Sequence, residues 1–272
     1  MEQNLKKVLK YFSLFAYYPT LEEIHTFLPV KIRKDELKKE LKHLKYTPPQ
    51  YSIGKQISKR KLENWCFKVY VKLLSFFPQI KLIGLSGSIA MMNADLDDDI
   101  DLFITAAKSR LFTARFLATT IAFIMGLKRG VGLKKAPNKV CLNLFFDESN
   151  LKVPKFKQTE FVGHEVLQMK PIVNKNKAYE RFLFANRWVT TFFPNTAGLI
   201  SKIKNQRSKT SSKIKSLSFK LGSNICTLIF DLFEKITKIL QLSLISRHRT
   251  TEIITDFQLW FHPVDFDKKI KL

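Results

Sequence analysis

Two short apolar runs, residues 80–85 and 99–105, constrain the fold of this chain more than any other feature of its sequence. The first run is rich in Ile and Leu and ends at a Ser-Gly-Ser turn signal, and the second alternates polar and apolar side chains. An apolar helical segment follows at residues 111–127 and a third strand-like run at residues 140–146. This order of elements predicts an α+β core with a small mixed β-sheet and flanking helices.

Acidic residues crowd the start of the second predicted strand, and one pair among them shares a face. Because successive side chains of a strand point to opposite sides, Asp99 and Asp101 point together while Ile100 points into the core. The alternative pair, Asp97 and Asp99, flanks the polar Asp98, so the residues before Asp99 are interpreted as a loop. Adjacent carboxylates are tolerated where a cation bridges them, and Mg²⁺ is commonly held by carboxylates together with substrate phosphates. The pair Asp99 and Asp101 therefore predicts a Mg²⁺ site.

The turn before this strand has a composition suited to a phosphate group. Gly87 leaves the backbone free of side chains and Ser88 adds a hydroxyl, so the terminal phosphates of a nucleotide can approach closely. A hydrophobic strand, Gly-Ser, about a dozen residues and then Asp-hydrophobic-Asp resembles the signature of the DNA polymerase beta-like nucleotidyltransferase superfamily. The chain also resembles an uncharacterised bacterial group in which a winged-helix-like segment precedes this domain, a likeness that includes residues 141–144 and 186–189.

The resemblance implies a reaction and a set of roles. A nucleoside monophosphate would pass from a nucleoside triphosphate to an acceptor, with release of pyrophosphate. Asp99 and Asp101 would hold the Mg²⁺ that orients the triphosphate, and Gly87 and Ser88 would hold its outer phosphates.

One position departs from the family pattern. Many members carry a third carboxylate on a later strand, and the matching strand here offers Asn143. An amide oxygen can ligate a metal, but an amide cannot act as a base. Asp147 lies on the same face of that strand, about 13 Å further along. Either one metal suffices, or Asn143 is a neutral ligand, or activity is diminished; we favour Asn143 as a site residue.

Basic side chains near the motif are candidates for contact with the triphosphate. Lys108 and Arg110 follow the second predicted strand directly, and four more cations, among them Arg129, lie at residues 128–135. Both groups are equally consistent with side chains that keep a helix end or a loop solvated.

Histidine and cysteine residues show no ligand pattern. The five histidines do not cluster, although His164, Glu165 and Lys170 could line the acceptor side of a cleft. The three cysteines lack metal-ligand spacing, so neither a zinc site nor a disulfide framework is expected, and a reducing cytoplasm fits. The apolar run at residues 116–127 is shorter than the ~20 residues of a spanning helix, so no transmembrane segment is expected.

Residues 1–57 are expected to form a separate winged-helix-like module before the core at residues 58–155. Three helical patterns occur here, with a Thr20–Glu23 capping box, Asp35 as the cap of the third helix and a candidate wing strand at residues 51–53. Such a module either binds nucleic acid or serves only in packing. A single amphipathic helix over residues 59–77 is expected to lead into the core.

Residues 156–272 are expected to form a helical region that closes the cleft. An apolar stripe over residues 225–239 is expected to pack on the domain, with contact to a membrane surface as the less favoured alternative. Residues 202–220 hold seven basic residues and no acid, which predicts a solvated linker or a phosphate-binding strap.

The net charge favours an anionic partner. The chain has 47 Lys and Arg against 23 Asp and Glu, or +24, which attracts nucleic acid, nucleotides and anionic lipid alike. We therefore predict a Mg²⁺-dependent nucleotidyltransferase that acts on RNA, a protein side chain or a small molecule. The alternatives are a nucleic-acid-binding or nucleotide-sensing protein with a degenerate transferase domain, and a peripheral membrane protein.

Overall fold

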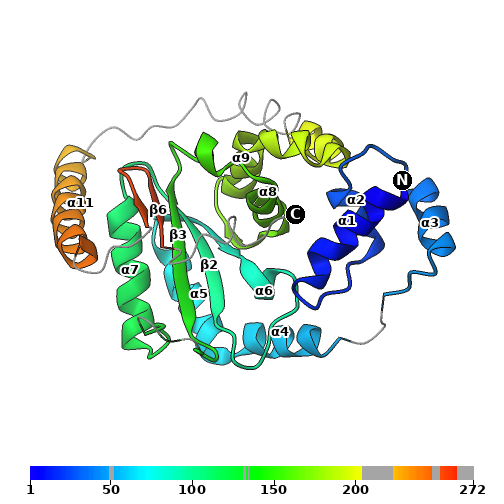
Figure 1. The fold of residues 1–272 in the computed structure, drawn as a ribbon. Helices are drawn as coiled ribbons and strands as arrows, with labels where there is room; N and C mark the ends of the chain where they lie inside the picture. Colours follow the sequence, from blue (N-terminus) through cyan, green and yellow to red (C-terminus); the bar gives the residue numbers. More distant parts are fainter. Residues whose placement is uncertain (49–51, 131–132, 134, 204–222, 247–251, 262–272) are drawn as a thin grey trace.

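A mixed six-stranded sheet lies between two layers of helices in the computed structural model (Figure 1), which describes residues 1–48, 52–130, 133, 135–203, 223–246 and 252–261. The strands are β1 (Ile80–Leu85), β2 (Ile100–Ala106), β3 (Val140–Asp147), β4 (Lys170–Asn174), β5 (Ile253–Ile254) and β6 (Gln258–Trp260). The helices are α1 (Glu2–Ser13), α2 (Leu21–Phe27), α3 (Lys34–His43), α4 (Ile53–Glu63), α5 (Trp65–Phe76), α6 (Gly87–Ala90), α7 (Leu111–Ile124), α8 (Glu160–Gln168), α9 (Ala178–Ala185) and α11 (Ser223–Ser246). Short 3₁₀ turns cover Lys155–Lys157, Arg187–Thr191 and Pro194–Thr196.

The strand order is β4-β1-β2-β3-β6-β5, and among these six strands of the described residues the β2–β3 pair is parallel and the other pairs are antiparallel. The predicted α+β class with a mixed sheet is therefore correct. The region at residues 156–272, expected to be helical, does contain α8, α9 and α11, but it also supplies β4, β5 and β6, which were not expected. These strands have two to five residues, and β4 contains Pro171, so they carry too little alternating pattern to be recognised.

The two faces of the sheet are both buried, which explains the apolar character of its central strands. Ile83 and Leu85 belong to a cluster with α5 and α7, whereas Leu82 and Phe103 belong to a cluster with α8, α9 and the N-terminal helices. Side chains of one strand thus enter two different cores, as the alternation of a strand requires.

The N-terminal region differs from the predicted winged helix in two respects. The capping box is confirmed, since the Thr20 side chain accepts a hydrogen bond from the Glu23 amide and Glu23 returns one. The N-cap of α3, however, is Arg33 rather than Asp35. The predicted wing strand is wrong for its described part, because Ser52 caps α4 and Ile53 begins that helix. Tyr51 lies outside the described residues.

The helix predicted over residues 59–77 is two helices. Asn64 ends α4 and its side chain accepts a hydrogen bond from the Phe67 amide, which caps α5. This local bond offers the backbone an alternative to a continuous helix. Tyr70 and Leu74 of α5 face the core, whereas Trp65 and Leu73 are exposed.

The N-terminal helices bury their apolar faces against residues that follow β3. The ring of His164 on α8 stacks on Tyr11 at 3.7 Å and on Phe27 at 4.2 Å between ring centroids. This burial lowers the pKa of His164, which is thus a core residue and not part of a cleft. The division at residues 57 and 155 stays a prediction.

Helix α11 contacts α7 through polar residues, and much of the apolar stripe expected to pack on the domain is exposed. Of the basic segment at residues 202–220, all but its first two residues lie outside the described part of the chain. None of the helices in the described part combines the length and the apolarity needed to cross a membrane.

Asn186 connects α9 to the segment after β3 and is fully buried. Its Oδ1 accepts bonds from the Val153 amide and from Trp188 Nε1, and its Nδ2 donates to the carbonyls of Leu151 and Phe182. An unsatisfied buried polar group is costly, so this one amide stabilises several backbone groups at once.

We expect Asn186→Ala to lower the free energy of unfolding by roughly 3 kcal/mol or more, because it leaves buried donors and acceptors without partners. Urea denaturation measures the change. Asn150→Ala, which truncates an exposed amide, is the control and should stay within about 0.5 kcal/mol of the wild type. Equal losses in the two variants would contradict this role of Asn186.

Candidate functional site

The pairing of β1, β2 and β3 gathers the predicted site at one edge of the sheet. Strand β2 runs antiparallel to β1 and parallel to β3, so the end of β1 meets the beginnings of the other two. The register places Leu85 opposite Leu102 and Asp101 opposite Cys141. Residues just after β1 therefore lie beside those at the start of β2 and β3.

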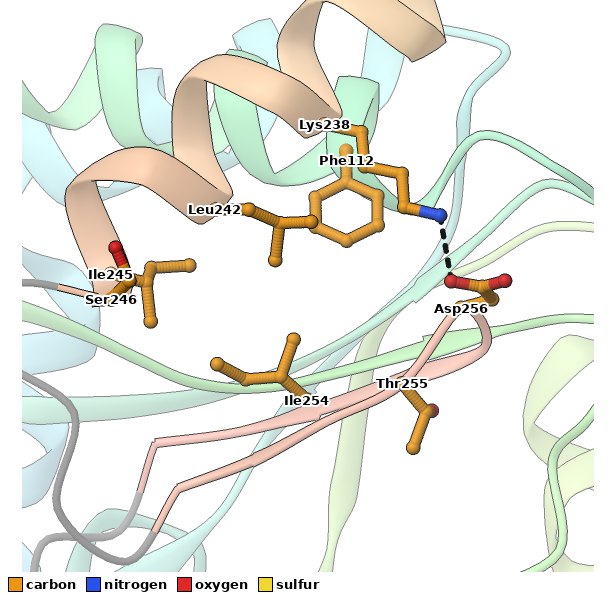
Figure 2. A pocket seen from close by; sticks show the side chains of 8 residues that line it. All are labelled: Phe112, Lys238, Leu242, Ile245, Ser246, Ile254, Thr255 and Asp256. Atoms are coloured by element: carbon orange, nitrogen blue, oxygen red, sulfur yellow. Dashed lines mark hydrogen bonds and ion pairs between the residues drawn. The ribbon is translucent and has the colours of Figure 1, made fainter.

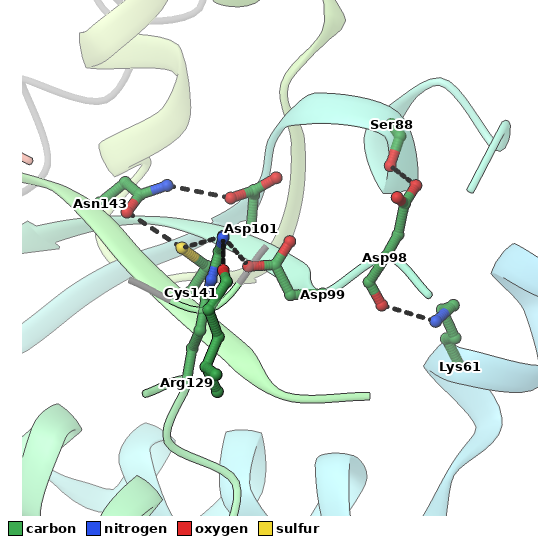
Figure 3. A network of polar contacts seen from close by, with 9 residues as sticks. Lys61, Ser88, Asp98, Asp99, Asp101, Arg129, Cys141 and Asn143 are labelled. Carbon is green, nitrogen blue, oxygen red and sulfur yellow. Dashed lines mark hydrogen bonds and ion pairs between the residues drawn. The ribbon is translucent and has the colours of Figure 1, made fainter. Parts of the chain in front are cut away.

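Asp99 and Asp101 share a face, as the alternation predicted. Together with Cys141 they form a group whose potential ligand atoms all lie within 4.8 Å of one another. Figure 3 shows the two carboxylates side by side at the start of β2.

Gly87 is required where the turn approaches Asp101. Its φ of +61° is a conformation that other residues rarely adopt, and a Cβ atom at this position would lie 2.6 Å from Asp101 Oδ2. The Ser86 amide also donates to the Asp101 carbonyl at 3.0 Å. The Asp101 carboxylate thus lies directly against the backbone of Gly87.

Asn143 and Cys141 extend the polar cluster onto β3. Asn143 Nδ2 donates to Asp101 Oδ1 at 3.0 Å, and the Cys141 thiol donates to Asn143 Oδ1 at 3.0 Å. The pairing of β2 and β3 shifts register between Leu102 and Phe103. Cys141 was not predicted as a site residue, although its position two residues before Asn143 on a strand is a signal that both face the same side.

Arg129 supplies the positive charge nearest to the carboxylates. Its Nη1 lies 2.5 Å from Asp99 Oδ2 and also contacts the Cys141 sulfur at 3.6 Å, while Nη2 donates to the Leu133 carbonyl. For Arg129, the sequence is consistent with either phosphate contact or solvation of a loop. The structure places it at Asp99, with a third of its side chain exposed.

Ser88 is at the site, but its hydroxyl has a protein partner. It donates to Asp98 Oδ2 at 2.7 Å, and the same oxygen accepts from the Asp95 amide. Lys61 Nζ bonds the Asp98 carbonyl from α4. These contacts fix the loop before β2, as expected for its acidic residues.

Lys108 and Arg110 are not brought to the carboxylates. They follow the opposite end of β2, about 20 Å along the strand direction from Asp101. The Lys108 amide donates to Glu148, and Arg110 pairs with Asp231 of α11 at 2.6 Å. Lys108 is exposed, in agreement with the solvation alternative, whereas the Arg110 side chain is only 14 % exposed and serves in an ion pair, which neither alternative predicted.

Asp147 is not a substitute for the third carboxylate. It is buried at the far end of β3, where its oxygens accept from the amides of Ser109 and Ser149 and from the Ser149 hydroxyl. Glu165 on α8 is the additional carboxylate near the site, since it lines the same cavity as Asp99 and Asp101.

The cavity beside the carboxylates has a volume of about 510 Å³, and its lining includes a polar and an apolar set of residues, here called the polar wall and the apolar wall. Gly87, Ser88, the carboxylates, Asn143 and Arg129 make the polar wall. Apolar and aromatic side chains make most of the other wall, among them Phe15, Leu144, Phe161, Met169 and Trp260. The cavity can therefore hold a ligand with a charged part and an apolar or aromatic part.

The electrostatics of the site favour the arrival of a cation. Burial raises the pKa of Asp101 to about 7, with further contributions from the charges of Asp99 and Glu165. Burial likewise raises the pKa of the Cys141 thiol, which keeps it protonated and a poor ligand. Near neutral pH the cluster thus holds one carboxylate paired with Arg129 and another whose ionisation is suppressed.

Comparing Gly87→Ala with Gly126→Ala tests the close approach at Asp101. Both glycines have a positive φ, but nothing lies within 4 Å of a Cβ at Gly126. We expect Gly126→Ala to cost about 1–2 kcal/mol from its backbone conformation alone. Gly87→Ala should cost more in urea denaturation, because Asp101 must also move. Equal losses in the free energy of unfolding for the two variants would show that Asp101 does not contact Gly87 closely.

The raised pKa of Asp101 predicts a pH dependence of stability in metal-free protein. The folded chain holds this proton more tightly than the unfolded chain, so the contribution of Asp101 to the free energy of unfolding is lost as the pH rises through about 7. In EDTA, the melting temperature of the wild type should fall from about pH 5 to about pH 8 by more than that of Asp101→Asn. Parallel profiles would contradict the raised pKa.

Comparisons with known proteins do not add a relative. No protein-family model matches the chain, and neither curated proteins nor solved structures give a match. Functional conclusions therefore depend on the geometry of the cluster around Asp99, Asp101 and Gly87.

Proposed function

We propose that the chain is a Mg²⁺-dependent nucleotidyltransferase that moves a nucleoside monophosphate from a nucleoside triphosphate to an acceptor. The observation that carries this proposal is the convergence of Asp99 and Asp101 with Gly87 at the wall of one cavity. The spacing of these residues, which resembles the superfamily signature, also supports the proposal.

The donor set of the cluster fits a hard divalent cation. Asp99 and Asp101 offer carboxylate oxygens, which Mg²⁺ prefers, and the neutral thiol of Cys141 does not suit a soft metal. A cation bound between the carboxylates would also offset the repulsion that suppresses ionisation of Asp101. When bound, Mg²⁺ supplies Lewis-acid stabilisation of the negative charge on the triphosphate.

Protein groups on the polar wall hold and orient the triphosphate. The bare backbone at Gly87 allows the Asp101 carboxylate to lie at the polar wall, and the Ser88 hydroxyl, now bonded to Asp98, can turn to a phosphate oxygen. When the triphosphate binds, the Arg129 guanidinium leaves Asp99 and bonds a phosphate oxygen instead.

Glu165 is the general base of the reaction, a role that the amide of Asn143 cannot perform. Asn143 positions Asp101 through its hydrogen bond, and Glu165 accepts the proton of the acceptor hydroxyl from the α8 side of the cavity. The acceptor oxygen forms a bond to the α-phosphorus while the bond from that phosphorus to the β-phosphate oxygen breaks. Pyrophosphate leaves with the electron pair, and the base and sugar of the nucleotide contact the apolar wall.

A second candidate function is a nucleotide sensor without catalysis. The ion pair of Arg129 with Asp99 and the amide at Asn143 both favour it, because they reduce the number of charged ligands at the site. Such a protein would bind a triphosphate and Mg²⁺ but release both unchanged. Binding of nucleic acid by a chain with a net charge of +24 is compatible with either function.

Transfer of an α-³²P label tests the proposal. Each of the four ribonucleoside triphosphates is incubated with Mg²⁺ and the protein, with RNA, with cell lysate or with no acceptor. We expect label transfer by the wild type and a loss of about a hundredfold or more in Asp101→Asn, because the variant removes a metal ligand. Asp97→Asn is the matched control, since it makes the same change at an exposed loop carboxylate paired with Lys135.

Equal transfer by wild type and Asp101→Asn would contradict the assigned role of this carboxylate. Triphosphate binding by the wild type that needs Mg²⁺ but gives no transfer to any acceptor would favour the sensor. Binding that ignores both Mg²⁺ and the Asp101→Asn change would remove the metal from the site.

A further inference from the structure

Helix α11 has its polar and apolar faces reversed relative to an ordinary surface helix. Six of its aliphatic residues are between 46 and 68 % exposed and recur at the spacing of one helical face: Leu228, Ile229, Leu232, Ile236, Ile239 and Leu240. We call these six residues the outer face. In Figure 1, α11 lies at the edge of the molecule, with α7 between it and the sheet.

The opposite side of α11 attaches the helix through polar contacts. Both carboxylate oxygens of Glu234 accept bonds at 2.8 Å from the first amides of α7, at Phe112 and Thr113. Gln241 is buried and bonds the Phe112 carbonyl and Arg115. These contacts cap the N-terminus of α7 and fix which side of α11 faces outward.

The inner side is not closely packed. A cavity of about 320 Å³ separates α11 from β5, and its lining includes Phe112, Leu242 and Ile254 (Figure 2). The ion pair between Lys238 and Asp256, 2.7 Å long, spans its rim. Apolar burial on the body of the protein thus does not explain why α11 is so rich in Leu and Ile.

The charges around the outer face are positive or neutralised. Both acids of α11 are engaged away from this face, Asp231 with Arg110 and Glu234 with the α7 amides. In sequence, seven basic residues and no acid occupy positions 202–220 before the helix, and two arginines and no acid occupy positions 247–251 after it. The positive charge of this part of the sequence therefore favours an anionic surface as the partner of the outer face.

We propose that the outer face of α11 docks on the surface of an anionic phospholipid bilayer. The helix would lie in the plane of the interface, with the aliphatic side chains of the outer face among the acyl chains. A second copy of the chain fits this face less well, because each copy carries a net charge of +24 and the copies repel each other. This proposal does not depend on the reaction proposed above.

Vesicle co-sedimentation tests it, with phosphatidylcholine vesicles prepared with and without phosphatidylserine. The full chain should partition onto the vesicles that contain phosphatidylserine. The double variant Leu232→Glu, Ile236→Glu should lower the partition coefficient about tenfold or more, because it places charges in the centre of the outer face. Circular dichroism and light scattering on the same samples report folding and oligomeric state.

The matched control is the double variant Trp65→Glu, Phe76→Glu on α5. It also replaces two exposed apolar residues and changes the net charge by the same amount. We expect it to partition within about twofold of the wild type. Three results would overturn the proposal: no partition of the wild type, equal partition of the wild type and the α11 variant, or a wild-type dimer that the α11 variant converts to a monomer.

Discussion

The antiparallel pairing of β1 with β2 and the parallel pairing of β2 with β3 determine which residues meet at the site. This arrangement brings the turn after β1 to the first residues of the other two strands. Burial of both faces of the sheet fixes the register, because a slip of one residue would send every core side chain to the wrong face. The position of Asp99 and Asp101 beside Gly87 is therefore a consequence of core packing, and it needs no ligand to hold it.

The same packing makes it unfavourable to ionise Asp101. Asp101 is placed against backbone at Gly87 and next to Asp99, so its charge is poorly solvated and its pKa is raised. The ion pair with Arg129 offsets the negative charge of Asp99, and Asn143 donates one hydrogen bond to Asp101. A chain with an excess of positive charge thus concentrates carboxylates at one cavity, which is the arrangement that a divalent cation and a triphosphate would complete.

The local pattern of polar and apolar residues predicted the strands that carry the site. It did not predict features that depend on contacts between residues far apart in the sequence. The alternation around Ile100 placed Asp99 and Asp101 correctly on one face, and β1 has the predicted bounds. The position of Arg129 depends on the loop before β3, which no periodicity describes. Strands β5 and β6 are too short to carry a pattern, and Lys108 was placed near the carboxylates because sequence proximity ignores which end of β2 it follows. The outer face of α11 was expected to be buried for a similar reason, since an apolar stripe reveals one face of a helix but not what covers it.

The most direct measurement of the central claim is anomalous diffraction from crystals of the chain grown with Mn²⁺ and a non-hydrolysable nucleoside triphosphate. The account predicts one Mn²⁺ peak in contact with carboxylate oxygens of both Asp99 and Asp101, with the Arg129 guanidinium moved from Asp99 to a phosphate oxygen. An unchanged ion pair between Arg129 and Asp99, with no peak between the two carboxylates, would contradict it.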